Sequence, residues 1–289
     1  MSGPNFMTLL QAKWDEGKYV CVGLDPDYEK IPEHIKATTA YEPSLEQFKV
    51  AAIKTFLFGI IDATYDIVVA FKPNAAFFER YGWRGVQLLE EVVAYINSRN
   101  HDLPVILDAK RGDIGNTNDG YVESAFGQIG ADAITVHPYM GQESLKPFLD
   151  RADKGVFVLC RTSNPGAGEF QDEFLGSSTL YEQVAINVAG LWNKNGNCAL
   201  VVGATAPNEL EEVRRLVGDI PILIPGVGAQ GGRIEDVVPV GINSKGQGIL
   251  INLSRNVLYA SKGEDYATAA RLIIEEHNDA IIAAGAKGV

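Results

Sequence analysis

The sequence predicts a (β/α)₈ barrel, the TIM-barrel architecture, formed as a single domain by residues 1–289. Short apolar segments alternate with amphipathic segments along the chain, and eight of the apolar kind are present. Strict alternation of strands and helices implies parallel strands joined by right-handed crossovers. No linker rich in Gly, Ser or Pro divides the chain. Eight repeats fit a closed barrel better than an open sheet of seven units, which is the alternative.

The expected strands are the short apolar runs, at residues 19–23, 67–71, 105–107, 133–136, 156–160, 199–202, 222–224 and 249–252. The expected helices are amphipathic segments between them, at residues 44–63, 83–98, 178–193, 208–217 and 264–284. In the last helix apolar residues recur every three or four positions, and His277 falls within that stripe as a packing residue. Residues 5–17 predict an extra N-terminal helix that covers the base of the barrel. The segment 239–248 is longer than a minimal connection and receives no role.

Composition and charge exclude several classes of partner. The formal charge of −12 opposes general affinity for nucleic acid or for an anionic membrane. No apolar run approaches the roughly 20 residues of a membrane span, and the N-terminus lacks the basic start of a signal peptide. Cys21, Cys160 and Cys198 are far apart in apolar surroundings, which predicts free thiols and a cytoplasmic protein. Neither a Cys pair nor a metal-binding His pattern occurs, so no metal is expected.

Charged and polar residues gather directly after the predicted strands. They are Asp25, Lys72, Asp108, Lys110, residues 161–163, the Gly-rich stretch 226–232, Ser254 and Arg255. In a (β/α)₈ barrel the carboxyl ends of all strands meet at one mouth, where the active sites of this architecture lie. The sequence therefore predicts one polar site at that mouth.

The segment 107–114 holds the densest group of these charges. Asp108 and Lys110 are two residues apart, so on a regular strand their side chains face the same way. Asp113 follows just after Gly112, which lets the backbone turn. Burying a charge inside a barrel costs free energy. Charges placed directly after a buried strand therefore favour a reaction site. A solvated surface cluster with weak ion pairs is the plain alternative.

The stretch 225–232 contains four glycines after an apolar strand, which lets backbone N–H groups approach a phosphate. Arg255, after the next strand, adds charge-assisted hydrogen bonds, and these two loops form the usual phosphate site of such barrels. A tight turn and a solvated Arg are the alternatives. Residues 163–178 are long enough to form a mobile lid, or a disordered insertion. His137 has no carboxylate near it in sequence and is expected to be structural.

Five segments together resemble the orotidine 5'-phosphate decarboxylase family, in its longer bacterial branch (type 2). They are 22–26 (VGLDP), 71–74 (FKPN), 107–117 (LDAKRGDIGNT), 161–167 (RTSNPGA) and 225–232 (PGVGAQGG). The resemblance covers nearly the whole chain. It implies decarboxylation of orotidine 5'-phosphate to UMP and CO₂ without a cofactor, the last step of de novo pyrimidine synthesis. The chain departs from the family's pattern in the loop after the eighth strand. Small residues are expected before the phosphate-binding Arg255, and Leu253 and Ser254 occupy that place here.

The resemblance also implies roles for individual residues. Asp108 lies against the substrate carboxylate, and Lys110 donates the proton to C6. Lys72 and Asp113 complete a catalytic charge network of alternating sign. Three residues enter the site from the other subunit of a homodimer with shared active sites: Asp113, Ile114 and Thr117. The remaining substrate contacts implied are Asp25 (with Lys72) for the ribose, and Ser163, Gly228, Gln230, Ser254 and Arg255 for the pyrimidine and the phosphate.

Two other functions compete with this interpretation. A metal-assisted decarboxylase of a keto-sugar phosphate shares the D-x-K-x-x-D pattern on the same barrel. A non-enzymatic barrel that binds a phosphorylated ligand would use the charges only for recognition. Lys72 on the second strand, together with Ser163 and Gln230, favours the first interpretation, and four charges exceed what phosphate binding needs.

Overall fold

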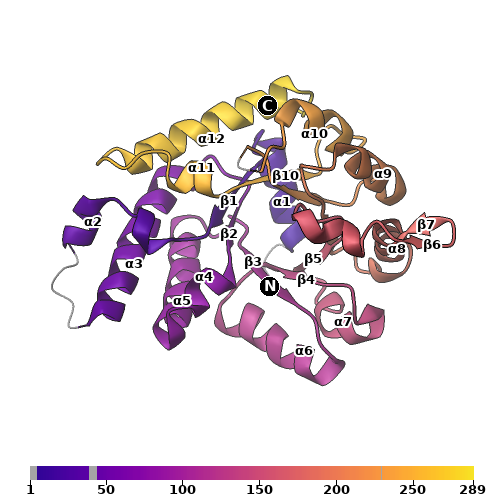
Figure 1. Cartoon of the computed structure of the whole chain (residues 1–289), viewed down its shortest axis with the longest axis horizontal. Helices are drawn as coiled ribbons and strands as arrows, with labels where there is room; N and C mark the ends of the chain where they lie inside the picture. Colours follow the sequence, from indigo (N-terminus) through magenta and orange to yellow (C-terminus); the bar gives the residue numbers. More distant parts are fainter. Residues whose placement is uncertain (1–4, 39–43, 229) are drawn as a thin grey trace.

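The computed structural model describes residues 5–38, 44–228 and 230–289, and within them eight parallel strands form a barrel surrounded by helices (Figure 1). The strands follow the order β2-β1-β10-β9-β8-β5-β4-β3, and bridges from Phe71 to Val105 and from Asn74 to Asp108 join β2 to β3. The predicted (β/α)₈ architecture is therefore confirmed. The strands are β1 (Val20–Leu24), β2 (Ala70–Pro73), β3 (Ile106–Arg111), β4 (Ala133–Val136), β5 (Gly155–Leu159), β8 (Cys198–Val201), β9 (Ile222–Pro225) and β10 (Ile249–Leu253).

Each barrel strand overlaps one of the predicted apolar runs. Every residue of β1, β4 and β8 is buried, as expected for parallel strands covered by side chains on one face and by helices on the other. The third strand extends beyond the predicted 105–107, because residues 108–111, three of which are charged, continue it to the mouth of the barrel. The strands thus deliver their last residues to one end of the molecule.

The predicted helices are all present, and others accompany them. The longer helices are α1 (Phe6–Asp15), α3 (Leu45–Thr64), α5 (Gly82–Arg99), α6 (Gly115–Val122), α7 (Gly141–Leu149), α8 (Leu180–Asn187), α9 (Pro207–Val217), α10 (Ile234–Gly241) and α12 (Tyr266–Ala283). Short helices are α2 (Glu33–Thr38), α4 (Ala75–Glu79) and α11 (Arg255–Leu258). The sequence patterns named above do not include α6, α7 or α10. Pro147 and Pro239 lie inside α7 and α10, and α6 is rich in Gly and Asn, features that weaken the local helix signal.

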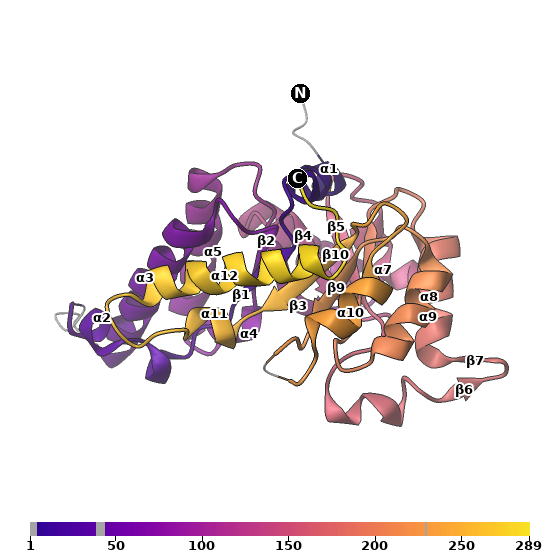
Figure 2. The ribbon, with the colours of Figure 1, turned by 90° about the horizontal axis from the view of Figure 1, so that it is seen from above.

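Helix α1 closes the base of the barrel, as predicted. The Phe6 ring packs edge-to-face on Phe157 of β5, with the ring centroids 5.7 Å apart. A Cβ atom at Gly155 would lie 2.3 Å from the Phe6 ring, so this contact requires glycine. The Trp14 indole donates a hydrogen bond of 2.9 Å to the carbonyl of Ile249, where β10 begins. Figure 2 shows α1 on one side of the barrel and the hairpin of β6 (Phe174–Leu175) and β7 (Ser178–Thr179) on the opposite side.

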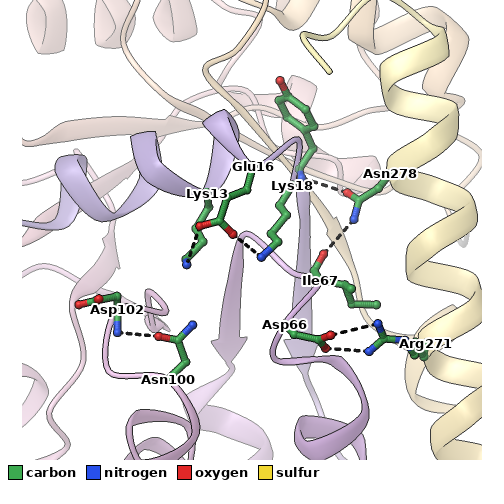
Figure 3. A network of polar contacts seen from close by, with 10 residues as sticks. Lys13, Glu16, Lys18, Asp66, Ile67, Asn100, Asp102, Arg271 and Asn278 are labelled. Atoms are coloured by element: carbon green, nitrogen blue, oxygen red, sulfur yellow. Dashed lines mark hydrogen bonds and ion pairs between the residues drawn. The ribbon is translucent and has the colours of Figure 1, made fainter. Parts of the chain in front are cut away.

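Asn278 of α12 ties that helix to the first strands at the same base (Figure 3). Its Oδ1 accepts the N–H groups of Tyr19 and Val20 at 3.0 and 3.1 Å, and its Nδ2 donates to the carbonyl of Ile67 at 2.9 Å. His277, the preceding residue, is half-buried with Nδ1 2.7 Å from the Ile273 carbonyl of its own helix. His277 is thus a helix residue at the base of the barrel, and it does not line the cavity described below.

The segment 239–248, which had no predicted role, completes the base. Its first residues end α10, and the buried side chain of Gln247 donates to Asp15 at 3.0 Å and accepts from Gln11 at 2.8 Å. No helix among the described residues has both the length and the apolar character of a membrane-spanning segment.

Candidate active site

A cavity of about 800 Å³ opens at the carboxyl ends of the barrel strands, a size typical of small-molecule sites. Most of the predicted site residues line it: Asp25, Lys72, Asp108, Lys110, Ser163, Gln230, Ser254 and Arg255. Four predicted residues are not among its lining: Asp113, Ile114, Thr117 and Gly228. The structure therefore brings the residues of six separate loops and strands into one site.

Asp108 lies between two ammonium groups at the floor of this cavity. Its Oδ2 is 2.7 Å from Nζ of Lys72, and its Oδ1 is 2.6 Å from Nζ of Lys110. The Thr135 hydroxyl also lies 3.0 Å from Oδ1. Lys72 and Asp108 are only 4% and 8% exposed, whereas half of the Lys110 side chain remains accessible. The array therefore presents one half-exposed ammonium, that of Lys110, to the cavity, backed by the buried Lys72–Asp108 ion pair.

Both members of the buried pair stay charged at neutral pH. Burial alone would raise the pKa of Asp108, but the charges of Lys72 and Lys110 outweigh it and hold that pKa well below its usual range. Burial alone would lower the pKa of Lys72, but the carboxylates of Asp108 and Asp25 raise it above its ordinary value. The cavity floor thus carries fixed charges of alternating sign.

The backbone of β3 is irregular where it carries Asp108 and Lys110. Its register with β4 shifts between Leu107 and Arg111, and Lys110 has a φ of +47°. Lys110 is the one residue other than glycine with positive φ in the described chain. The two side chains do converge as predicted, but the predicted reason, regular strand alternation, is wrong. A left-handed residue at the strand end turns Lys110 back onto Asp108.

His137 supports the turn that follows. Its Nε2 lies 2.9 Å from the carbonyl oxygen of Gly112, and a Cβ atom at Gly112 would approach the ring to 2.6 Å. His137 does not line the cavity, so its predicted structural role agrees with its position. Gly112 is required here by the close contact of the imidazole with its backbone.

Two oxygens without partners mark the wall formed by β1 and β10. Oδ1 of Asp25 and Oδ1 of Asn252 are buried and accept no hydrogen bond, and both residues line the cavity. Buried acceptors of this kind normally have a donor, so both atoms are available to hydrogen-bond donors of a ligand in the cavity. Asn252 was missed in the sequence, as was Thr135. The signal available for both was a single polar residue inside an otherwise apolar strand.

The Gly-rich loop follows β9 and Arg255 follows β10. Both strands lie across the barrel from β3, which carries Lys110. Gly226 and Gly228 have φ values of +101° and +69°, which an L-residue rarely adopts. The N–H of Gly228 donates to the carbonyl of Gly232 at 2.9 Å, so Gly228 shapes the loop from within. Gln230 and the exposed Arg255, the first residue of α11, line the cavity.

The segment 163–178 has structure of its own, unlike a disordered insertion. It contains a 3₁₀ helix (Pro165–Glu169) and most of the β6–β7 hairpin. The Arg161 guanidinium holds the Asp172 carboxylate through two hydrogen bonds of 2.7 and 3.0 Å. Gln171 bonds to Thr162 and reaches the cavity, together with Ser163. The segment is thereby fastened over one wall of the site.

Asp113, Ile114 and Thr117 lie outside the cavity, at the start of α6. The Asp113 carboxylate accepts the N–H of Ile114 at 2.7 Å, and Asn118 bonds both backbone groups of Asp113. Ile114 is 54% exposed. Within one chain these three residues are therefore not assembled with the charge array. In the described part of the chain no group of three or more His, Cys, Asp or Glu residues is placed to hold a metal ion.

A family model described as "Orotidine 5'-phosphate decarboxylase / HUMPS family" matches residues 18–273. The chain belongs to this family. It is 49% identical over 277 residues to orotidine 5'-phosphate decarboxylase of Janthinobacterium sp. (strain Marseille), covering 96% of this chain and 97% of that one. It is 48% identical to the enzyme of the same name from Azoarcus sp. (strain BH72), covering 96% and 98%.

Solved structures agree with this assignment. Leishmania donovani OMP decarboxylase superposes with a TM-score of 0.81 at 38% identity, over 96% of this chain and 99% of that one. Leishmania donovani UMP synthase gives a TM-score of 0.85 at 39% identity, over 98% of this chain and 57% of the longer protein. Family and fold are thus established by sequence and structure together.

Proposed function

We propose that this protein decarboxylates orotidine 5'-phosphate to UMP and CO₂, the last step of de novo pyrimidine synthesis. Family membership and the names of relatives close to 50% identical support the reaction. The single observation that carries it is the Lys72–Asp108–Lys110 array on the cavity floor. An ammonium backed by a buried ion pair suits a reaction that creates negative charge on carbon.

Lys110 is the proposed proton donor. Loss of CO₂ breaks the bond between C6 and the carboxyl carbon and leaves the electron pair on C6. The Lys110 ammonium stabilises that carbanion and transfers a proton to it, forming the C6–H bond of UMP. Half of the Lys110 side chain is exposed, so solvent can return the proton afterwards. Since the protein supplies this charge itself, the proposed reaction uses no cofactor.

Asp108 and Lys72 complete the proposed reaction centre. The Asp108 carboxylate faces the substrate carboxylate and repels it in the ground state, a repulsion that disappears with CO₂. Lys72 holds Asp108 in place at 2.7 Å and keeps it ionised. Asp25 and Lys72 bind the ribose hydroxyls, a role supported by the unpartnered Oδ1 of Asp25.

The phosphate is proposed to bind at the loops after β9 and β10. Arg255 pairs with the phosphate charge, helped by the Gly-rich loop around Gly228 and by Ser254. Gln230 reaches the phosphate from the Gly-rich loop, and Ser163 reaches the pyrimidine from the segment over the cavity. Because the phosphate lies far from C6, its contacts contribute binding energy without taking part in bond breaking.

We propose a homodimer that completes each site with residues of the partner. Asp113 is the last charge of the expected network, yet it lies outside the cavity of its own chain. Ile114 beside it is an exposed apolar residue, and Tyr139 in the loop after β4 is 91% exposed. A second copy covering this edge would bury both and supply Asp113, Ile114 and Thr117 across the interface.

The chain is further proposed to act as a single domain in the cytoplasm. The eight strands close one barrel that the helices surround, which supports one domain over residues 1–289. Cys21, Cys160 and Cys198 are all buried free thiols, and burial raises the pKa of each to about 12. Inert reduced thiols are typical of a reducing compartment.

A spectrophotometric assay tests the proposal, since conversion of orotidine 5'-phosphate to UMP changes its ultraviolet absorbance. The purified protein should turn the substrate over and keep full activity after dialysis against EDTA. Lys110→Ala should lower kcat by at least about a thousandfold, because stabilisation and protonation of C6 are lost together. Lys110→Arg is the matched control: it keeps the charge but has no titratable proton at neutral pH.

A flat absorbance trace from folded wild-type protein would refute the function. Turnover that requires an added metal would instead favour the keto-sugar phosphate chemistry. Recovery of near wild-type kcat by Lys110→Arg would contradict the role of Lys110 as proton donor.

A further inference from the structure

Thr135, in the middle of β4, joins the strained end of β3 to the charge array through one hydroxyl group. Its Oγ1 accepts the N–H of Ala109 at 3.1 Å and the N–H of Lys110 at 2.9 Å. The same Oγ1 lies 3.0 Å from Oδ1 of Asp108. Thr135 is 1% exposed and lines the cavity.

The direction of each of these hydrogen bonds follows from the capacity of a hydroxyl. A hydroxyl has two acceptor lone pairs and one proton to donate. The N–H groups of Ala109 and Lys110 occupy both lone pairs, so the remaining proton is donated to Asp108. Every hydrogen-bonding position of the Thr135 hydroxyl is therefore used, and no rotation of the O–H bond is free.

These contacts support the irregular end of β3. Between Leu107 and Arg111 its register with β4 shifts, and there the Thr135 hydroxyl accepts the N–H groups of Ala109 and Lys110. Lys110 also sits at a φ of +47°, a conformation that is costly for any residue with a Cβ. By accepting both N–H groups, Thr135 stabilises the turn that directs Lys110 toward Asp108.

We propose that Thr135 is a positioning residue for the reaction, fixing Lys110 and Asp108 relative to each other. The inference rests on the proposed decarboxylation. Thr135 acts through its neighbours: its proton occupies Oδ1 of Asp108 beside Lys110, leaving Oδ2 to Lys72. Loss of the hydroxyl frees Lys110 to leave the geometry from which it protonates C6, while the phosphate end of the cavity is untouched.

Two comparisons at position 135, Thr with Val and Ser with Ala, separate the effect of the hydroxyl oxygen from that of side-chain shape. Thr135→Val keeps the shape and removes the hydroxyl, whereas Thr135→Ser and Thr135→Ala differ from each other only by the oxygen atom. We expect kcat to fall at least about tenfold in the Val and Ala variants, because misplaced catalytic groups lose rate steeply. Thr135→Ser should keep most of the wild-type kcat. The dissociation constant for UMP should change by less than about twofold in all three, since UMP binding draws on the phosphate contacts.

Thr64→Val supplies the control for the loss of a buried threonine hydroxyl. Thr64 is fully buried in α3, away from the cavity, and its hydroxyl donates to the Ile60 carbonyl at 2.7 Å. This variant should lower the unfolding midpoint while kcat stays at the wild-type value. A role for Thr135 in stability alone would give the same pattern in Thr135→Val.

The split between kcat and UMP affinity gives a readout that a purely structural role would leave unchanged. A fall in kcat with an unchanged dissociation constant for UMP locates the effect at Lys110 and Asp108 and not at the phosphate contacts.

Wild-type kcat in folded Thr135→Val, or equal losses in the Ser and Ala variants, would overturn the proposal. Absence of turnover in the wild type would refute the decarboxylase function itself, and the two failures are thereby distinguished.

Discussion

Asp108 is the residue on which the charge array depends, because it is the partner of both ammonium groups. Lys72 is 4% exposed and bonds to Asp108 at 2.7 Å, so removal of the carboxylate would leave a buried charge unpaired. The pKa of Asp108 is held below its unfolded value of about 3.9. Its ion pairs therefore stabilise the fold above that pH, and this contribution is lost as the pH falls through the folded pKa.

Asp108→Asn should lower the free energy of unfolding by about 3–5 kcal/mol at pH 7, the usual cost of breaking a buried pair from one side. The difference from wild type should start to shrink below about pH 4, because the carboxyl of the unfolded chain then binds a proton that the folded ion pairs exclude until a lower pH. Denaturant unfolding at pH 7, 5 and 3.5 measures this. Asp153→Asn is the control, since its ion pair with Arg151 is exposed and worth under about 1 kcal/mol. A difference that stays constant across this range would contradict the assignment.

At the scale of elements, the segment between β5 and α8 is held over one wall of the cavity by the Arg161–Asp172 ion pair and by the hydrogen bonds of Gln171 with Thr162. Arg161 at the end of β5 grips Asp172, and the stretch between them contributes Ser163 and Asn164 to the cavity. The exposed rings of Phe170 and Phe174 give this segment little apolar packing of its own. The order of the segment therefore depends on the ion pair more than on a core.

Asp172→Asn should raise KM for orotidine 5'-phosphate about tenfold, because the loosened segment must be ordered when the substrate binds. Steady-state kinetics measure the effect. Asp150→Asn, which removes the exposed pair with Lys146 on α7, should leave KM unchanged. An unchanged KM in Asp172→Asn would show that the ion pair does not order the binding wall.

At the scale of the whole molecule, one chain assembles only part of the expected network. Lys72, Asp108 and Lys110 meet inside its cavity, while Asp113 remains outside with its carboxylate on the N–H of Ile114. The helix α6 that follows Asp113 places this residue at the edge of the mouth. The proposed homodimer, with a site shared across a two-fold interface, would account for that separation.

Mixing Lys110→Ala with Asp113→Ala protein tests the shared site. After random exchange of subunits half of the dimers are mixed, and each mixed dimer holds one site with both residues intact. The mixture should therefore regain about a quarter of the wild-type activity. Mixing Lys110→Ala with Asp108→Ala should regain none, because both of these residues belong to one chain's cavity. No recovery in the first mixture, despite verified exchange, would exclude sharing of Asp113.

Most of the barrel was predictable from sequence because buried parallel strands are continuous apolar runs. All eight were located from that pattern, and the polar residues after them line one cavity. Three of the longer helices, α6, α7 and α10, were not named from sequence, and they form because packing overrides Gly, Asn and Pro in their sequences. Local propensity carries no information about such tertiary contacts.

The sequence by itself determined the architecture, the end of the barrel that carries the site, and the family, since periodicity and motif spacing are properties of the chain alone. Only the tertiary structure decided how Lys110 reaches Asp108. A shift in strand register, a left-handed residue and the Thr135 hydroxyl on the neighbouring strand together set that contact. These depend on groups 25 or more residues apart in the chain, and no local pattern records a contact over that separation.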